Sequence, residues 1–171
     1  TDEGASCERH IYDASALSPM VAAPHSPANT APVGDMENVA IDIAYIGACT
    51  GAKLDDLRAA AQVLRGRKVA SNVRLLVAPA SIKDQDAAEK EGTLGVLVDA
   101  GAQLFATACG ACSGYGNALS GDVTVISSTA RNFKGRMGSP DARVYLGSPY
   151  TVAASALTGR ITDPRAVLEA I

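Results

Sequence analysis

The residues with the clearest potential for chemistry are two cysteines three positions apart, Cys109 and Cys112, in the stretch TACGACSGYG. Their neighbours are small, so little side-chain bulk surrounds the two thiols. The chain has only four cysteines among its 171 residues, too few for a disulfide framework. A close pair of this kind is typical of a redox site, a structural zinc site or an iron–sulfur cluster, and the pair alone does not choose among them.

A third cysteine, Cys49, follows an apolar run over 41–46 in the segment GACTGA. The run predicts a buried strand, and a later run over 103–107 predicts another just before Cys109. The carboxyl ends of parallel strands meet at one edge of a sheet, so the three thiols should converge there. Three thiolates favour a soft metal centre of zinc, copper(I), or iron with sulfide.

Zinc and an iron–sulfur cluster differ in whether they need a fourth protein ligand. A structural zinc site needs one more ligand, and the remaining candidates are Cys7, His10 and His25, none of them at the spacing of a zinc knuckle. An iron–sulfur cluster held by only three thiolates would keep one iron open to water or substrate. That iron could act as a Lewis acid towards a hydroxyl or carboxylate oxygen.

A hydroxyl-rich and basic loop, SSTARNFKGR over 127–136, follows the next predicted strand and should reach the same edge. Arg131 and Arg136 suit carboxylate groups, because a guanidinium donates paired hydrogen bonds to a carboxylate. The alternative is a surface ion pair with Asp122 or Asp141. Ser128 is a candidate to bind substrate in the pocket, and the alternative is that it only caps a turn.

Strands alternate with helices along most of the chain, which predicts an α/β fold with three αβα layers and a mostly parallel sheet. The expected strands are 41–46, 73–77, 103–107, 123–126 and 143–146, and the expected helices are 52–64, segments within 83–99 broken near Gly92, 150–157 and a short one within 164–171.

The first 38 residues differ from the rest, because prolines recur there every three to five positions. Such spacing excludes a long helix and favours extended segments. We expect residues 1–38 to form an extended Pro-rich arm or inter-domain connector and residues 39–171 to form the α/β domain.

Composition excludes several classes of partner. The net charge is −3 and no long run of Lys and Arg occurs, so nucleic acid is not expected to bind. No apolar run approaches the roughly 18 residues that a membrane span needs. We expect no membrane partner and a cytoplasmic location.

Taken together, the motifs resemble those of the aconitase and isopropylmalate dehydratase superfamily, in the cluster-binding C-terminal part of the large subunit. The family pattern reads Gly-Ser-Cys-Thr-Asn-Gly, Cys-Gly-x-Cys and Ser-x-Asn-Arg-Asn-Phe-x-Gly-Arg. This chain has GACTGA, CGAC and STARNFKGR in the same order, followed by GSPYTVAASALTGRITDP.

The resemblance implies ligands, substrate contacts and an activity. Cys49, Cys109 and Cys112 would bind a four-iron, four-sulfur cluster with one iron not ligated by cysteine, and Arg131 and Arg136 would bind substrate carboxylates. The expected activity is that of a hydro-lyase acting on a small hydroxy di- or tricarboxylic acid.

The resemblance also implies that this chain does not act alone. Relatives take catalytic residues from upstream large-subunit domains and from a swivel domain or small subunit, so we expect both as partners. The alternative is a non-catalytic iron–sulfur or zinc module for binding or assembly. Two departures from the family pattern, Gly51 and Ala130 in place of Asn, suggest an altered pocket.

Overall fold

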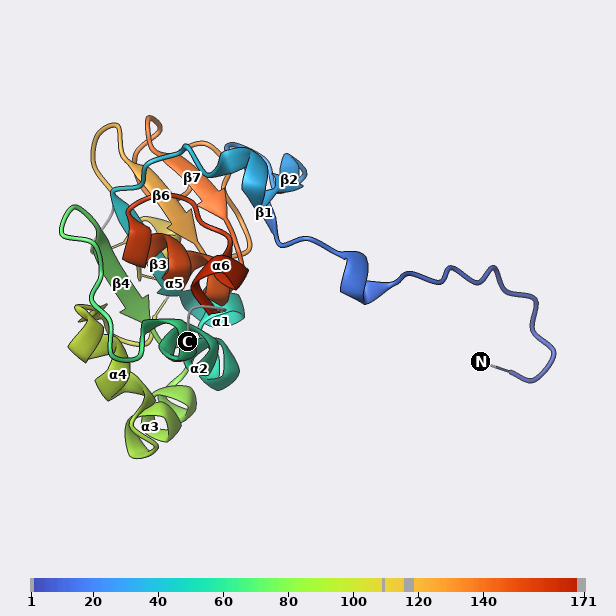
Figure 1. Ribbon diagram of the computed structural model, residues 1–171, viewed down its shortest axis with the longest axis horizontal. Helices are drawn as coiled ribbons and strands as arrows, with labels where there is room; N and C mark the ends of the chain where they lie inside the picture. The colour runs from blue at the N-terminus through green and yellow to red at the C-terminus, as the bar shows by residue number, and fades with distance from the viewer. Residues whose placement is uncertain (1, 109, 116–118, 169–171) are drawn as a thin grey trace.

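The computed structural model describes residues 2–108, 110–115 and 119–168 (Figure 1). Its strands are β1 Met20–Ala22, β2 Thr30–Pro32, β3 Ile43–Gly47, β4 Arg74–Ala78, β5 Gln103–Leu104, β6 Thr124–Ser127 and β7 Arg143–Leu146. Its α-helices are α1 Ala48–Gly51, α2 Leu54–Leu64, α3 Ile82–Lys90, α4 Thr93–Ala100, α5 Pro149–Thr158 and α6 Pro164–Leu168. Short 3₁₀ turns are η1 Ala14–Ala16, η2 Val33–Met36 and η3 Gly110–Ser113.

The strands form one sheet in the order β2-β1-β7-β6-β3-β4-β5. The five strands from β7 to β5 are parallel, and β1 and β2 add an antiparallel edge. The chain builds outwards from β3 through β4 to β5, and then returns to place β6 on the other side of β3. The sheet therefore changes direction between β3 and β6, where a doubly wound sheet opens a crevice for ligands.

One face of the sheet is covered by helices. Alternate strand residues such as Ala44, Ile46 and Val77 point to this face and pack with α2, α4 and α5 into the main core. Helix α2, expected over 52–64, buries Leu57 and Leu64 at helical spacing. The expected α/β fold with a mostly parallel sheet is thus confirmed.

Two long connections build the layer on the other face, in the described part of the chain. Tyr45, Leu76 and Val125 point to that side and pack against Cys112 of η3 and Met137 of the loop after β6. The third layer therefore carries the cysteine and arginine segments directly against the sheet.

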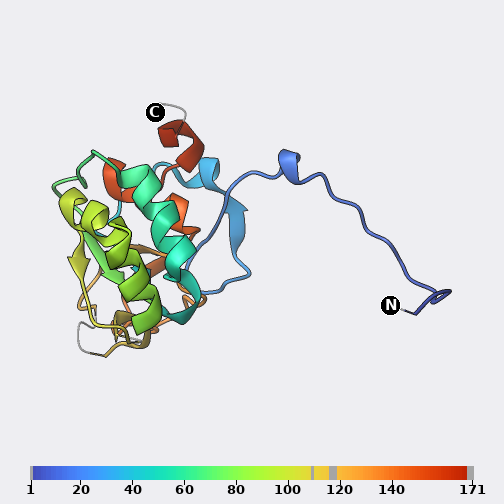
Figure 2. The ribbon, with the colours of Figure 1, turned by 90° about the horizontal axis from the view of Figure 1, so that it is seen from below.

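The N-terminal segment divides into two parts. Residues 2–18 are exposed, and Figures 1 and 2 both show this segment leading away from the sheet. Residues 20–32, expected to be part of the arm, instead supply β1 and β2. The hairpin attaches through the pair Ala22–Leu146, at the open edge of β7.

The predicted elements match the structure with small shifts in their bounds. Strand β5 ends at Leu104 rather than 107, although the Phe105 N–H makes one more bond to the Val77 carbonyl of β4 at 2.8 Å. The helix expected from residue 52 is preceded by the separate turn α1, because Ala52 has a non-helical backbone conformation. Gly92 separates α3 from α4 as expected, with φ +84°.

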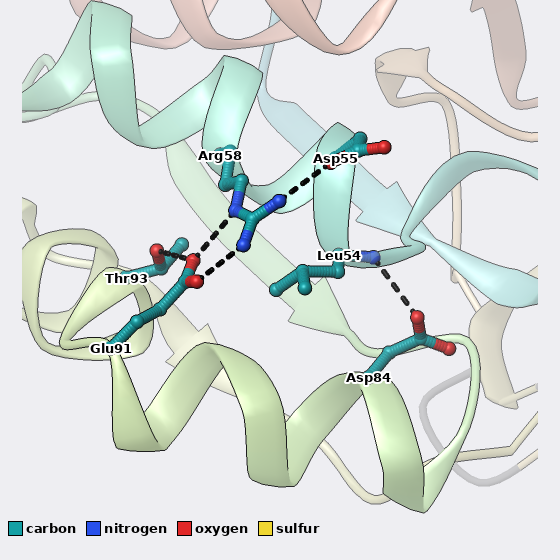
Figure 3. A network of polar contacts seen from close by, with 6 residues as sticks. All are labelled: Leu54, Asp55, Arg58, Asp84, Glu91 and Thr93. Carbon is teal, nitrogen blue, oxygen red and sulfur yellow. Dashed lines mark hydrogen bonds and ion pairs between the residues drawn. The ribbon is translucent and has the colours of Figure 1, made fainter.

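An ion network joins the outer helices (Figure 3). The Arg58 guanidinium donates to both carboxylate oxygens of Glu91, at 2.9 and 2.6 Å, and to Asp55 at 2.8 Å. The bonds from Arg58 to Glu91, followed by one from the Thr93 hydroxyl, lower the pKa of Glu91 to about 2. The backbone N–H of Leu54 donates to Asp84 at 3.1 Å, so acidic groups tie α2 to α3 and to the start of α4.

Throughout the described ranges, every helix is too short or too polar to cross a bilayer.

Candidate metal and anion site

Cys49 lies at the crevice between β3 and β6, in the single turn α1 that follows β3. The residue before it, Ala48, has φ +65°, a left-handed conformation that residues with a Cβ rarely adopt. Cys49 is exposed and has a free thiol. The turn therefore presents the thiol at the edge where the sequence predicts a site.

Cys112 lies in η3 on the loop-covered face of the sheet. Its free thiol belongs to a residue that is only 8% exposed, packed beside Ala111. The Gly110 carbonyl accepts bonds from the Tyr115 N–H at 3.1 Å and the Ser113 hydroxyl at 3.2 Å, which close the turn. Cys109, the third predicted ligand, lies outside the described residues.

A cavity of about 200 Å³ brings the predicted groups together. Its walls come from the three segments after β3, β5 and β6: Ala48, Cys49, Thr50, Cys112, Ala130, Arg131 and Arg136. Two thiols and two guanidinium groups that are up to 87 positions apart, from Cys49 to Arg136, thus share one cavity. Such a cavity can hold a thiolate-bound metal centre beside an anion.

Arg136 contacts a thiol directly. Its Nη2 lies 3.7 Å from Cys112 Sγ, within reach of a weak hydrogen bond to sulfur. Its Nε is buried and has no hydrogen-bond partner among the described residues, although a buried donor normally finds one. Asp122, one of the surface partners considered from the sequence, instead pairs with Arg143 at 2.6 Å. The polar surroundings of Arg136 are therefore the cavity and the cysteine.

Ser128 contacts the Cys49 turn. Its hydroxyl donates to the Gly51 carbonyl at 2.7 Å and accepts from the Gly47 N–H at 3.1 Å. A Cβ on Gly51 would lie 2.0 Å from the Ser128 carbonyl oxygen. Asparagine, which the family pattern has at this position, would not fit this backbone without a shift.

Asn132 is a supporting residue that the sequence analysis missed. Its side chain is fully buried, and its Nδ2 donates to the carbonyls of Ala23 at 2.8 Å and Val144 at 3.0 Å. These bonds anchor the loop between the two arginines to β7 and to the end of β1. The signal in the sequence was its place in the motif STARNFKGR, where the family pattern also has Asn.

The other candidate zinc ligands lie elsewhere. Cys7 and His10 belong to the exposed N-terminal segment, where His10 pairs with Glu8 at 3.2 Å. Within residues 2–108, 110–115 and 119–168, no three His, Cys, Asp or Glu side chains gather as a metal site. Cys7, His10 and His25 are all absent from the described residues that line the cavity of Cys49 and Cys112.

Comparison with known proteins identifies the family of the chain. The family model described as "Aconitase family (aconitate hydratase)" matches residues 31–159, which include both arginines and all three site cysteines. The chain is 44% identical over 169 residues to "3-isopropylmalate dehydratase large subunit 1" of Archaeoglobus fulgidus, covering 98% of this chain and 40% of that protein.

Two further relatives have similar sequence identity and coverage. The "3-isopropylmalate dehydratase large subunit" of Campylobacter hominis is 47% identical, covering 96% of this chain and 40% of the relative. The "Probable methanogen homoaconitase large subunit" of Methanosarcina mazei is 49% identical, covering 92% and 40%. The chain thus spans about 40% of the length of the curated relatives it matches. By the extent of the family match and these identities, the chain belongs to the aconitase family.

Proposed function

We propose that this chain is the cluster-bearing part of an iron–sulfur hydro-lyase that acts on a small hydroxy di- or tricarboxylic acid. The observation that carries the proposal is the shared cavity, in which Cys49 and Cys112 lie beside Arg131 and Arg136. Membership of the aconitase family implies a four-iron, four-sulfur cluster as the cofactor.

The residues around the cavity fit such a cluster. Thiolate sulfur is the ligand that iron–sulfur clusters take, and two thiols face one cavity, with Cys109 three positions before one of them. Ala48 and Ala130 leave space on the cavity walls. The positive charge of Arg136 beside Cys112 would stabilise a bound thiolate.

The roles of the individual residues follow from this placement. Cys49, Cys109 and Cys112 would hold the cluster, which when bound would supply a Lewis-acidic iron free of cysteine. Arg131, whose side chain is exposed at the cavity, would bind one substrate carboxylate and orient it. Arg136, with its unpartnered Nε, would bind a second carboxylate from the wall of the cavity.

The proton transfers of the reaction need groups from outside this chain. Its two histidines, His10 and His25, lie in the N-terminal segment, and the cavity walls carry no carboxylate in the described residues. We therefore propose that upstream large-subunit domains and a swivel domain or small subunit complete the site. Residues 1–38 would connect to the upstream part and residues 39–171 would form the cluster-binding domain.

The test is assembly followed by an activity assay. The chain would be loaded with iron and sulfide without oxygen, combined with the upstream part and the small subunit of a relative, and assayed with citrate, homocitrate and isopropylmalate. Turnover that is lost when Arg131 is changed to alanine would support the proposal. Stable assembly without turnover on any hydroxy acid would instead favour the non-catalytic module.

A further inference from the structure

The turn that carries Cys49 adopts a conformation that its own sequence disfavours. Ala48 has φ +65°, although it has a Cβ and is not one of the residue types enriched in that region. Such conformations persist where the surrounding structure determines them, and they often lie beside functional groups. Something outside the turn must therefore hold it.

The Ser128 hydroxyl provides that support, because it bonds to both ends of the turn. It accepts from the Gly47 N–H at 3.1 Å and donates to the Gly51 carbonyl at 2.7 Å, two positions on either side of Cys49. Ser128 is itself fixed by the sheet, since its N–H donates to the Tyr45 carbonyl of β3 at 3.0 Å. The turn is thus tied to the end of β6 across the crevice.

Close packing reinforces these bonds. Gly51 lies so near Ser128 that a Cβ would approach the Ser128 carbonyl oxygen to 2.0 Å and its Oγ to 2.7 Å. The absence of a side chain at residue 51 is what allows the turn to lie against Ser128.

We infer that Ser128 is a positioning residue, which locks the strained turn and aims Cys49 into the cavity, rather than a residue that binds substrate. A serine hydroxyl has one proton to donate, and the Gly51 carbonyl accepts it. Ser128 also stands outside the described residues that line the cavity. The link from the turn to cluster retention rests on the proposed function, whereas the lock itself does not.

The first test measures backbone amide exchange in the 171-residue chain without iron. In Ser128→Ala, the Gly47 amide loses its acceptor and should exchange about tenfold faster, as expected for one lost hydrogen bond. The amide of Ile46, within β3, should be unchanged. Ser128→Thr keeps the hydroxyl and should restore slow exchange at Gly47.

Ser155 offers a matched control. Its hydroxyl also donates to a backbone carbonyl, that of Thr151 at 2.7 Å, and accepts from a backbone N–H, that of Thr162 at 3.1 Å, but it lies in α5 away from the cysteines. Ser155→Ala should leave exchange at Gly47 unchanged.

The second test uses the iron-loaded chain and measures the release of iron to a chelator. Ser128→Ala should release iron several-fold faster than the wild-type chain, while Ser128→Thr and Ser155→Ala should not. Unchanged Gly47 exchange in Ser128→Ala would overturn the lock. So would unchanged iron release combined with weaker hydroxycarboxylate binding, since that pattern marks a substrate contact.

Two further outcomes remain decisive. If Ser128→Ala does not fold, exchange in the wild-type chain decides, because the lock requires the Gly47 amide to be as protected as those inside β3; an unprotected Gly47 amide overturns it. If the wild-type chain takes up no cluster, the proposed function fails, and the exchange experiment still decides the lock.

Discussion

Replacing Gly51 with alanine should destabilise the chain and disturb the Cys49 turn. The new Cβ would lie 2.0 Å from the Ser128 carbonyl oxygen, where real Cβ contacts are essentially never below 3.0 Å, so backbone must move by about 1 Å. Such overpacking costs about 1–3 kcal/mol. The same shift would strain the 2.7 Å bond from Ser128 to the Gly51 carbonyl, which contributes about 1 kcal/mol.

Urea and thermal unfolding would measure this loss. We expect the free energy of unfolding to fall by about 2–4 kcal/mol and Tm to fall by roughly 5–15 °C. Gly95→Ala is the matched control, because Gly95 lies in α4 and a Cβ added there would have no atom within 4 Å. That substitution should stabilise by about 0.5–1 kcal/mol. If Gly51→Ala unfolds like the wild-type chain or behaves like Gly95→Ala, the close packing of Gly51 against Ser128 is refuted.

Three further predictions test the core, the ion network and the site. Leu57→Ala, at a fully buried position of the main core, should lower the free energy of unfolding by about 2–5 kcal/mol, measured in urea; a loss below 1 kcal/mol would contradict the packing. Because the folded-state pKa of Glu91 is lowered from 4.5 to about 2, the network stabilises the fold above pH 4.5 and loses this effect as the pH falls to about 2. Glu91→Gln should therefore flatten the pH dependence of stability in that window, and an unchanged slope would argue against the network. Cys7→Ser should bind as much iron as the wild-type chain, whereas Cys112→Ser should bind less; equal loss in both would place Cys7 in the site.

Local pattern was sufficient for the elements inside the sheet. The strand expected over 143–146 has the same bounds as β7. It was predictable because a short apolar run next to a turn can be recognised from residues that are adjacent in the sequence. The hairpin of β1 and β2 was not predictable in this way. Its prolines argue against a strand, yet β2 ends at Pro32 on the outer edge of the sheet, where a missing N–H costs no bond.

The site was also predictable only in part, because some of its contacts follow from strand order and others from the packing of distant loops. The shared cavity follows from strand order, since cysteines and arginines after parallel strands meet at one edge. The bonds of Ser128 to Gly47 and Gly51 join residues 81 and 77 positions apart, and those of Asn132 reach back to Ala23. Such contacts depend on how the loops pack in space, which no local pattern records. The motifs of the aconitase family suggested the proposed ligands and include Asn132, but they did not indicate which backbone groups Ser128 and Asn132 bind.

We propose that Cys49, Cys109 and Cys112 together hold a four-iron, four-sulfur cluster. The most direct measurement is the iron and sulfide content of the chain after reconstitution without oxygen, together with its visible absorption. We expect four irons and four sulfides for each wild-type chain, and loss of the chromophore when all three cysteines are changed to serine. The same chromophore in that triple variant, or zinc in place of iron in a wild-type chain purified without oxygen, would contradict it.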